Sequence, residues 1–401
     1  MANVSSSNGL EKRPKLRFPG FDEPYKQCRI GDIYAERSQR GASDMELLSV
    51  TMNDGVKPRS EIEGKDNSSE DKSNYKIVRK GDMVYNSMRM WQGANGISPC
   101  DGIVSPAYTV LMPKQEINNG YFAALFKSVT LINEFRKNSQ GMTSDTWNLK
   151  YPQIETIKVQ IPSVSEQDKV SELFSVLDER IATQAQLVES LKKYKRGVVR
   201  ILLSPKHCSI KNVKWTTSRI GDIGTFIKGA PLSKADISLE GTPFILYGEL
   251  YTTYSEVISN VVRKTQASVD KQYYSQIGDV IIPTSGETPE EISTASCVML
   301  PDIILAGDLN IYRCTQVDGR IMSYILNHVV NDRIARIAQG KSIVHVQAAE
   351  ISKIEITYPD SFSQKTIIAI LAAISDRIDQ SNAELRLLYE LRKALLQKLF
   401  I

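Results

Sequence analysis

The chain has 401 residues, of which 41% are hydrophobic and 24% are charged, and its formal net charge is +4 at pH 7. This length is sufficient for two or three domains with substantial cores, and the composition excludes a disordered or fibrous protein. The mildly basic charge permits a nucleic-acid partner without requiring one. No apolar run approaches the length of a membrane span, and the five cysteines include no C-x-x-C pair, so we expect a cytoplasmic protein with neither a zinc site nor a disulfide framework.

The first part of the chain predicts a polar arm followed by a globular domain. Residues 1–20 lack the apolar core of a signal peptide, which favours a flexible N-terminal arm. Residues 21–160 open with the pentapeptide R-I-G-D-I at 29–33, contain a helical stretch over 121–135, and end in an alternating apolar strand over 154–161. Short strands, frequent glycine and one helix indicate an α+β domain on a mostly antiparallel sheet.

Residues 161–204 predict one long spacer helix. Apolar residues recur there at alternating spacings of four and three, which is the heptad stripe of a coiled coil. Gln184 and Lys195 interrupt the stripe, and polar residues at such positions reduce stability but can fix register and the choice of partner. The predicted seam residues of this helix are Val170, Phe174, Leu177, Ile181, Val188, Leu191, Val198 and Leu202.

The second half of the chain repeats the first. Residues 205–357 begin with the same R-I-G-D-I pentapeptide at 219–223, and residues 358–401 align with the first helix without a gap at a shift of 197 residues. Ser381 and Arg392 align with Gln184 and Lys195, the two polar interruptions of the first helix. Two unrelated amphipathic helices on separate cores would not explain this coincidence. The predicted seam residues of the second helix are Ile367, Leu371, Ile374, Ile378, Leu385, Leu388, Leu395 and Leu399.

These repeats predict a tandem duplication. The fold class is α+β, with two homologous domains, each followed by a long helix, and the two helices pairing as an antiparallel coiled coil around a pseudo-twofold axis. Two copies are too few for a solenoid.

This pattern resembles the specificity (S) subunit of type I restriction–modification systems over essentially the whole chain. The first helix start, with Pro162, Glu166 and Gln167, is the stronger of the two matches; the second has Ser363 in place of Glu166. The other segments that carry the resemblance are the basic arm over 12–21, both R-I-G-D-I pentapeptides, and the helix ends over 195–198 and 395–400.

The resemblance implies that each globular domain is a target-recognition domain that reads one half of a bipartite, asymmetric site in double-stranded DNA. It also implies that the helices set the spacing and recruit two methyltransferase (M) subunits, which carry S-adenosylmethionine and methylate adenine at N6. Restriction (R) subunits, which use ATP and Mg²⁺, can join the complex. The chain itself is expected to bind no cofactor and no metal, and to have no catalytic residue. The sequence contains no N-P-P-Y or D-P-P-Y stretch, no P-loop and no clustered histidines.

DNA contacts are expected from polar and basic loop residues of both domains. Arg and Lys suit guanine edges and phosphates, Asn and Gln suit adenine, and Thr can pack on the thymine methyl group. Trp91 and Trp147 could stack on bases or wedge between them, although an aromatic side chain is more often part of a core. The candidates are Lys57, Arg59, Arg89, Gln92, Arg136, Lys137, Gln140 and Thr143 in the first domain, and Lys228, Thr284, Ser285, Arg333, Arg336, Gln339, Lys341 and Ser342 in the second.

Two other functions stay open at this point. The chain could be a structural adaptor whose coiled coil joins two proteins, without DNA specificity. An enzyme with an unrecognised site is the third and weakest alternative. Binding to duplex DNA that weakens with salt separates the first two, because an adaptor would show none.

Overall fold

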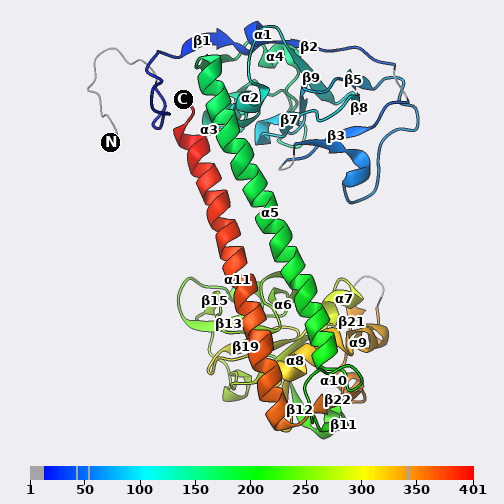
Figure 1. Ribbon diagram of the computed structural model, residues 1–401. Helices are drawn as coiled ribbons and strands as arrows, with labels where there is room; N and C mark the ends of the chain where they lie inside the picture. Colours follow the sequence, from blue (N-terminus) through cyan, green and yellow to red (C-terminus); the bar gives the residue numbers. More distant parts are fainter. Residues whose placement is uncertain (1–12, 42–43, 53–54, 341–343) are drawn as a thin grey trace. The chain divides into compact units, whose positions relative to one another are not determined.

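The computed structural model describes residues 13–41, 44–52, 55–340 and 344–401. Its contacts divide the chain into two units (Figure 1). Unit 1 consists of Met1–Ala185 with Ala383–Ile401, and unit 2 consists of Gln186–Asn382. Each unit contains one globular domain and a part of each of the two long helices.

The globular part of unit 1 contains small antiparallel sheets. The largest has the strand order β2-β9-β6-β7, and every pairing between named strands of this unit is antiparallel, as predicted. Its strands are β2 (Tyr34–Glu36), β9 (Tyr108–Pro113), β6 (Met83–Asn86) and β7 (Asn95–Ile97). The two-stranded sheets pair β1 (Lys26–Arg29) with β10 (Lys158–Ile161), β3 (Leu48–Val50) with β4 (Val56–Pro58), and β5 (Lys76–Val78) with β8 (Gly102–Val104).

Short helices complete unit 1 and supply much of its core. The stretch expected to form one helix over 121–135 is two helices, because the Ser128 side chain accepts a hydrogen bond from the backbone N–H of Leu131 and caps a new helix. Phe122 and Phe126 pack on the ring of Tyr34 in this core. The helices are α1 (Ile30–Ile33), η1 (Arg59–Glu61), η2 (Met90–Gln92), α2 (Asn119–Leu125), α3 (Val129–Asn138) and α4 (Tyr151–Ile154).

Unit 2 has a larger mixed sheet with the strand order β12-β20-β16-β18-β14 and a three-stranded sheet with the order β15-β13-β19. The pairs β13–β19 and β14–β18 are parallel, and the other named pairs of this unit are antiparallel. The strands are β11 (Trp215–Arg219), β12 (Gly224–Lys228), β13 (Thr242–Leu246), β14 (Val257–Ile258), β15 (Arg263–Thr265), β16 (Asp279–Pro283), β17 (Ser285–Gly286), β18 (Ser296–Val298), β19 (Ile304–Ala306), β20 (Leu309–Cys314), β21 (Val344–His345) and β22 (Glu355–Pro359).

The shorter helices of unit 2 include one that lies in the core. Helix α8 buries Ile321, Met322 and Ile325 against the mixed sheet. The helices are η3 (Ile220–Asp222), η4 (Lys234–Asp236), α6 (Glu249–Thr252), η5 (Lys271–Tyr273), α7 (Pro289–Ile292), α8 (Gly319–His328), α9 (Asn331–Ile337) and α10 (Ala348–Ile351). Among the described residues, no helix of either unit is long and apolar enough to cross a membrane.

Two long helices, α5 (Val164–Leu202) and α11 (Ser361–Lys398), carry the heptad stripes. Their 39 and 38 residues correspond to about 58 Å and about 57 Å at about 1.5 Å per residue. In unit 1 the rings of Phe174 and Phe400 stack at 5.9 Å, and Arg180 pairs with Glu384 at 2.8 Å, so the two helix segments run antiparallel. In unit 2, Leu202 and the first turns of α11 share one core. Every predicted seam residue is at least partly buried, which agrees with the predicted coiled coil.

The two polar interruptions at 195 and 392 have different partners. Lys195 is 8% exposed, and its Nζ donates to Glu256 at 2.8 Å, while His328 contacts the other oxygen of the same carboxylate at 2.7 Å. Burial opposes the ionisation of Glu256, but the hydrogen bond from His328 and the charge of Lys195 outweigh it and lower the pKa of Glu256 to about 2. Arg392 instead pairs across the helices with Asp178 at 2.5 Å. Lys195 therefore joins α5 to the globular part of unit 2.

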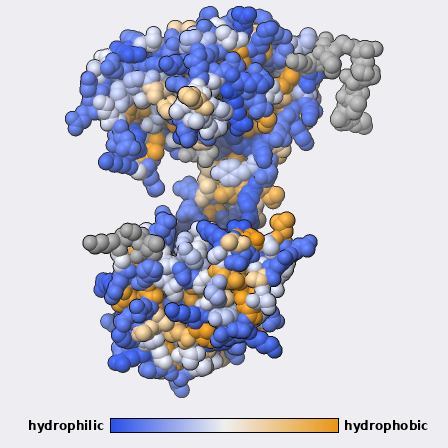
Figure 2. All heavy atoms as spheres, turned by 180° about the vertical axis from the view of Figure 1, so that it is seen from behind, coloured by the Kyte–Doolittle hydropathy of each residue, from blue (hydrophilic) through white to orange (hydrophobic). Residues whose placement is uncertain are grey.

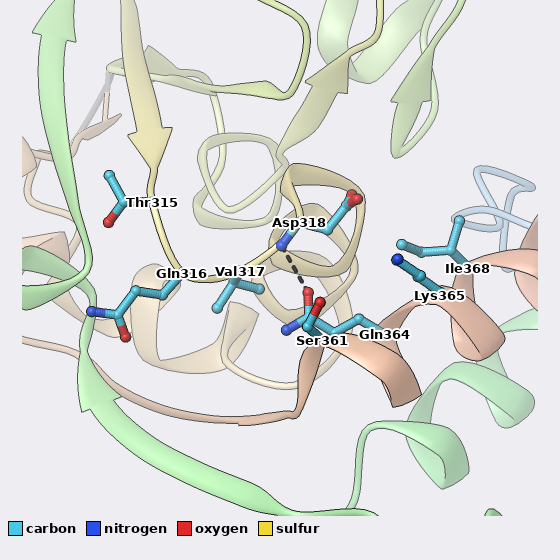
Figure 3. A pocket seen from close by; sticks show the side chains of 8 residues that line it. All are labelled: Thr315, Gln316, Val317, Asp318, Ser361, Gln364, Lys365 and Ile368. Atoms are coloured by element: carbon cyan, nitrogen blue, oxygen red, sulfur yellow. Dashed lines mark hydrogen bonds between the residues drawn. The ribbon is translucent and has the colours of Figure 1, made fainter.

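The duplication extends to individual hydrogen bonds. The side chain of Gln167 accepts from the backbone N–H of Asn118 at 3.0 Å and donates to the carbonyl oxygen of Pro162 at 3.0 Å. Gln364 makes the same two contacts in unit 2, with Asp318 and Pro359, each at 2.8 Å. Figure 3 shows the first of these, where the side chain of Gln364 meets the loop before α8.

The repeated R-I-G-D-I pentapeptide forms a single helical turn in both units. The backbone N–H of Gly31 donates to Glu155 at 3.0 Å, and that of Gly221 donates to Ser352 at 3.0 Å. A methyl group on Gly31 would lie 2.9 Å from the Cβ of Glu155, and one on Gly221 would lie 3.0 Å from the Cβ of Ser352. Glycine is needed because the turn packs directly on the segment before the closing strand.

Three expected boundaries differ from the observed ones by a few residues. The long helices begin at Val164 and Ser361, because β10 and β22 extend to Ile161 and Pro359. The closing strand does not include Ile154, since the N–H of Glu155 donates to the carbonyl of Tyr151 and closes a helical turn there. Ile154 is nevertheless fully buried, so the apolar pattern reported burial correctly but not the local conformation.

The described part of the N-terminal arm is not free, contrary to the expectation of flexibility. The guanidinium of Arg17 donates to both oxygens of Glu166 at 2.9 and 2.8 Å, and the hydroxyl of Tyr25 donates to one of them at 3.1 Å. The backbone N–H of Leu16 donates to Lys398 at 2.9 Å. Glu166 is 1% exposed, so it anchors the arm where α5 begins, and Ser363 provides no such anchor in unit 2.

Candidate nucleic-acid interface

An aromatic cluster on unit 1 gathers residues from three segments. The rings of Trp91 and Trp147 meet edge to face with centroids 5.2 Å apart. The guanidinium of Arg136, on α3, lies over Trp91 at 5.6 Å. The indole N–H of Trp91 donates to the carbonyl of Met88 at 3.0 Å, which fixes its orientation. Both tryptophans are half-buried, so they form a packed base beneath the adjacent loop.

The loop over 141–147 projects beside this cluster. The backbones of Gln140 and Asn148 exchange hydrogen bonds of 3.0 and 2.8 Å, which closes the loop like a short hairpin. The N–H of Leu149 donates to Ser87 at 2.8 Å and ties the loop to the segment after β6. Every residue over 140–146 is exposed. The loop is thus solvent-facing, but its base is fixed.

Most of the DNA-contact candidates of the first domain lie around this loop. They come from η2 and the residue before it, from the last turn of α3, and from the loop itself, and all are exposed: Arg89, Gln92, Arg136, Lys137, Gln140 and Thr143. Lys137 also pairs with Glu134 at 2.7 Å. The structure therefore brings together residues that are up to 54 positions apart in the sequence (Arg89 and Thr143). Their contact with DNA stays a prediction.

Lys57 and Arg59 do not belong to this group. Lys57 is half-buried on β4. The guanidinium of Arg59 donates to the backbone carbonyls of Ile62, Gly64 and Lys65 at 2.5, 2.9 and 2.8 Å. Because these donors hold the loop, they argue for a structural role of Arg59 rather than for a contact with DNA. Sequence alone shows no carbonyl oxygens, so this role was not visible there.

Unit 2 repeats the framework of the loop. Gln339 and His345 exchange backbone hydrogen bonds of 3.0 and 2.8 Å, and the N–H of Val346 donates to Thr284 at 3.0 Å, as Leu149 does to Ser87. Two of the second-domain candidates, Lys341 and Ser342, lie outside the described residues.

The other second-domain candidates fall into two groups. Lys228, Arg333, Arg336 and Gln339 are exposed, and Arg333 donates to the carbonyl of Glu355 at 3.0 Å. Ser285 is 5% exposed and donates to Asp308 at 2.8 Å, which argues against a direct contact with DNA. Thr284 is half-buried and offers its backbone to the loop base.

The two loops differ in chemistry. At the shift of 197 residues, Thr288 and Val344 stand where unit 1 has Trp91 and Trp147. Exposed Glu287 and Glu290 lie beside Thr288, in the segment that corresponds to η2. Unit 2 therefore lacks the aromatic pair and is more acidic there. The same framework presents different functional groups in the two units.

Sequence reasoning missed Met142, whose side chain is 99% exposed in the unit 1 loop. The face shown in Figure 2 is mostly hydrophilic on both units, with separate hydrophobic areas. An exposed apolar side chain is common on protein surfaces, so neither the sequence pattern nor a hydropathy count could have marked this one. It differs from other exposed apolar residues because its loop ends at Trp147, which belongs to the aromatic cluster.

The chain also has a polar pocket where α11 begins in unit 2. It encloses about 260 Å³ and is lined by Thr315, Gln316, Val317, Asp318, Ser361, Gln364, Lys365 and Ile368 (Figure 3). None of these residues is a DNA-contact candidate. Among the described residues, no group of three or more His, Cys, Asp and Glu is placed to hold a metal ion.

Comparison with known proteins gives one consistent result. The family described as "Type I restriction modification DNA specificity domain" matches residues 23–193 and again residues 212–388. The specificity subunit of the type I restriction enzyme MjaVIII from Methanocaldococcus jannaschii is 23% identical over 354 residues, which cover 80% of this chain and 79% of that protein.

Two solved structures share the fold. The S subunit of a type I restriction–modification system from M. genitalium superposes with a TM-score of 0.59 at 16% identity, covering 97% of this chain and 99% of that one. A chain from a structure on complex assembly and conformational transition of the type I restriction–modification system gives a TM-score of 0.60 at 14% identity, with coverages of 96% and 99%.

Proposed function

The chain belongs to the type I restriction–modification DNA specificity family, and from this premise we propose how its two units divide the recognition of DNA. It is the subunit that supplies sequence specificity to a type I restriction–modification complex. The observation that carries the proposal is the double match of this family, one match for each structural repeat.

Each unit reads one half of a bipartite site, and the two halves are unrelated in sequence. The support is that both units hold a loop on the same framework, through Leu149 and Val346, while the residues on that framework differ. Trp91 and Trp147 in unit 1 correspond to Thr288 and Val344 in unit 2. Because base readout depends on the groups presented, different groups select different bases.

The long helices recruit two M subunits and set the spacing between the half-sites. The support is the duplicated helix, which offers two similar surfaces on one chain. The M subunits carry S-adenosylmethionine and methylate adenine at N6, and R subunits with ATP and Mg²⁺ add restriction. The chain itself takes no part in bond-making steps: it contributes recognition and positioning only. We place the complex in the cytoplasm.

The test is co-expression with candidate M subunits from the same genome, followed by mapping of methylated adenines. We expect one bipartite, asymmetric site with an unread central stretch. A variant in which an unrelated loop of equal length replaces residues 140–148 should recognise a different first half-site. The second half-site should stay the same and serves as the internal control. If methylation needed no such site, or if the purified complex showed no salt-dependent binding to duplex DNA, the adaptor function would be favoured instead.

A further inference from the structure

We propose that Met142 is a wedge that enters between two stacked base pairs of the half-site read by unit 1. This inference rests on the proposed function, because it takes unit 1 as a reader of duplex DNA. It adds a specificity mechanism, namely readout of how easily one base step opens. Methionine is among the apolar side chains that unstack base steps in bent protein–DNA complexes.

The first support is the exposure of the side chain on a braced loop. Met142 is 99% exposed, although its loop is tied down on both sides. The N–H of Thr143 donates to the hydroxyl of Thr146 at 3.1 Å, and the N–H and hydroxyl of Thr146 each donate to the carbonyl of Thr143 at 2.9 Å. A braced loop loses little conformational freedom on binding, so an apolar tip can be inserted at a lower entropic cost.

The second support is the turn that presents Met142. Gly141 has a φ of +142°, and a methyl group on it would lie 2.6 Å from the carbonyl oxygen of Thr146. Only glycine fits this position without a shift of the loop backbone. The geometry of the turn therefore requires glycine at position 141. The same geometry fixes the direction in which Met142 leaves the loop.

The third support is the aromatic base behind the loop. Trp147 is the last residue of the loop and packs on Trp91, and the guanidinium of Arg136 lies over the ring of Trp91. Because both tryptophans are half-buried in this packing, they are not free to enter a base stack themselves. They instead resist displacement of the loop when its tip meets the duplex. Met142, and neither Trp91 nor Trp147, is therefore the side chain that acts as the wedge.

The fourth support is the charge around the tip. Arg89, Arg136 and Lys150 are exposed on the flanking segments, where phosphates on either side of an opened step would need cations. Asp145 is the acidic residue of the loop, and it is exposed as well. A carboxylate there disfavours a phosphate at the tip itself but can accept a hydrogen bond from the amino group of cytosine. This pattern fits a tip that meets bases and flanks that meet phosphates.

The experiment uses the full chain in complex with its M subunits and a duplex carrying the methylation-mapped site. The fluorescent base 2-aminopurine is placed at each step of the first half-site in turn. Binding of the unaltered complex should brighten one of these probes, because unstacking relieves quenching. Met142→Ala should remove this signal and weaken binding about ten-fold, whereas Met142→Leu should keep most of both.

Leu239→Ala is the matched control, since Leu239 is a 97% exposed apolar residue of unit 2. It should leave the signal at the first half-site unchanged. If no probe brightens while the complex binds and methylates its site, the wedge is wrong and the proposed function stands. Loss of binding in Met142→Ala without any probe signal in the unaltered complex also overturns the wedge. If no bipartite site is methylated at all, the proposed function fails, and the wedge fails with it.

Discussion

Replacing Glu256 with Gln should destabilise unit 2 strongly, because Glu256 is the partner of a buried lysine. The carboxylate is 15% exposed and accepts hydrogen bonds from Lys195 on α5 and from His328 on α8. Lys195 lies over the ring of Tyr324, with its Nζ 5.3 Å from the ring centroid. The variant would leave the ammonium group of Lys195 buried without its counter-ion. Breaking one side of such a pair costs about 3 to 5 kcal/mol.

The same contact gives a pH dependence whose sign follows from the pKa. The pKa of Glu256 is lowered from 4.5 in the unfolded chain to about 2 in the folded one. Its ionisation therefore stabilises the fold fully above about pH 5, and this contribution is lost as the pH falls towards 2. A difference of about 2.5 pKa units corresponds to about 3 kcal/mol. The difference in unfolding free energy between the unaltered protein and Glu256→Gln should shrink by that order between these two pH values.

Tryptophan fluorescence can report on the unfolding of unit 2 alone in urea. In a background with Trp91→Phe and Trp147→Phe, Trp215 on β11 is the remaining tryptophan and reports on unit 2. The control is Glu189→Gln, which removes the exposed partner of Lys192 on the part of α5 that belongs to unit 2. It should destabilise unit 2 far less than Glu256→Gln does, since exposed ion pairs contribute little. A Glu256→Gln variant as stable as the Glu189→Gln control, with an unaltered acid profile, would refute this reasoning.

Three further predictions concern assembly, spacing and affinity. Placing charges at Leu177 and Ile374 together should abolish assembly with M subunits, as size-exclusion chromatography with light scattering would show. A surviving complex with two M subunits would contradict the role of the apolar heptad stripes. Inserting one heptad after Val188 and one after Leu385 lengthens each helix by about 10 Å at about 1.5 Å per residue, or roughly three base pairs. Methylation mapping should then find the same half-sites farther apart; an unchanged gap with full activity would exclude the helices as the ruler. Arg136→Gln should weaken binding at the first half-site and reduce the salt slope by about one, whereas equal losses at both half-sites would argue against separate readers.

The sequence contained the duplication and the helices because both rest on local, periodic features. Stripes of apolar residues and a gap-free shift of 197 residues can be read without coordinates, and so could the resemblance to a family. The identity of Gly31 with Gly221, and of Gln167 with Gln364, is visible in the sequence as well. Their reasons are not visible, because both pairs are explained by contacts with segments far away in the chain: Gly31 with Glu155, for example.

Only the tertiary structure decided which polar residues are available to a partner. Arg59 and Ser285 read as candidates, but one holds a loop and the other is buried on Asp308, since side-chain hydrogen bonds depend on where backbone and neighbours lie. Conversely, Met142 carries no sequence signal, and its significance comes from its exposure on a braced loop beside Trp147. Periodicity reports which face of an element is buried, whereas the direction and freedom of a single loop side chain depend on the packing of the whole unit around it.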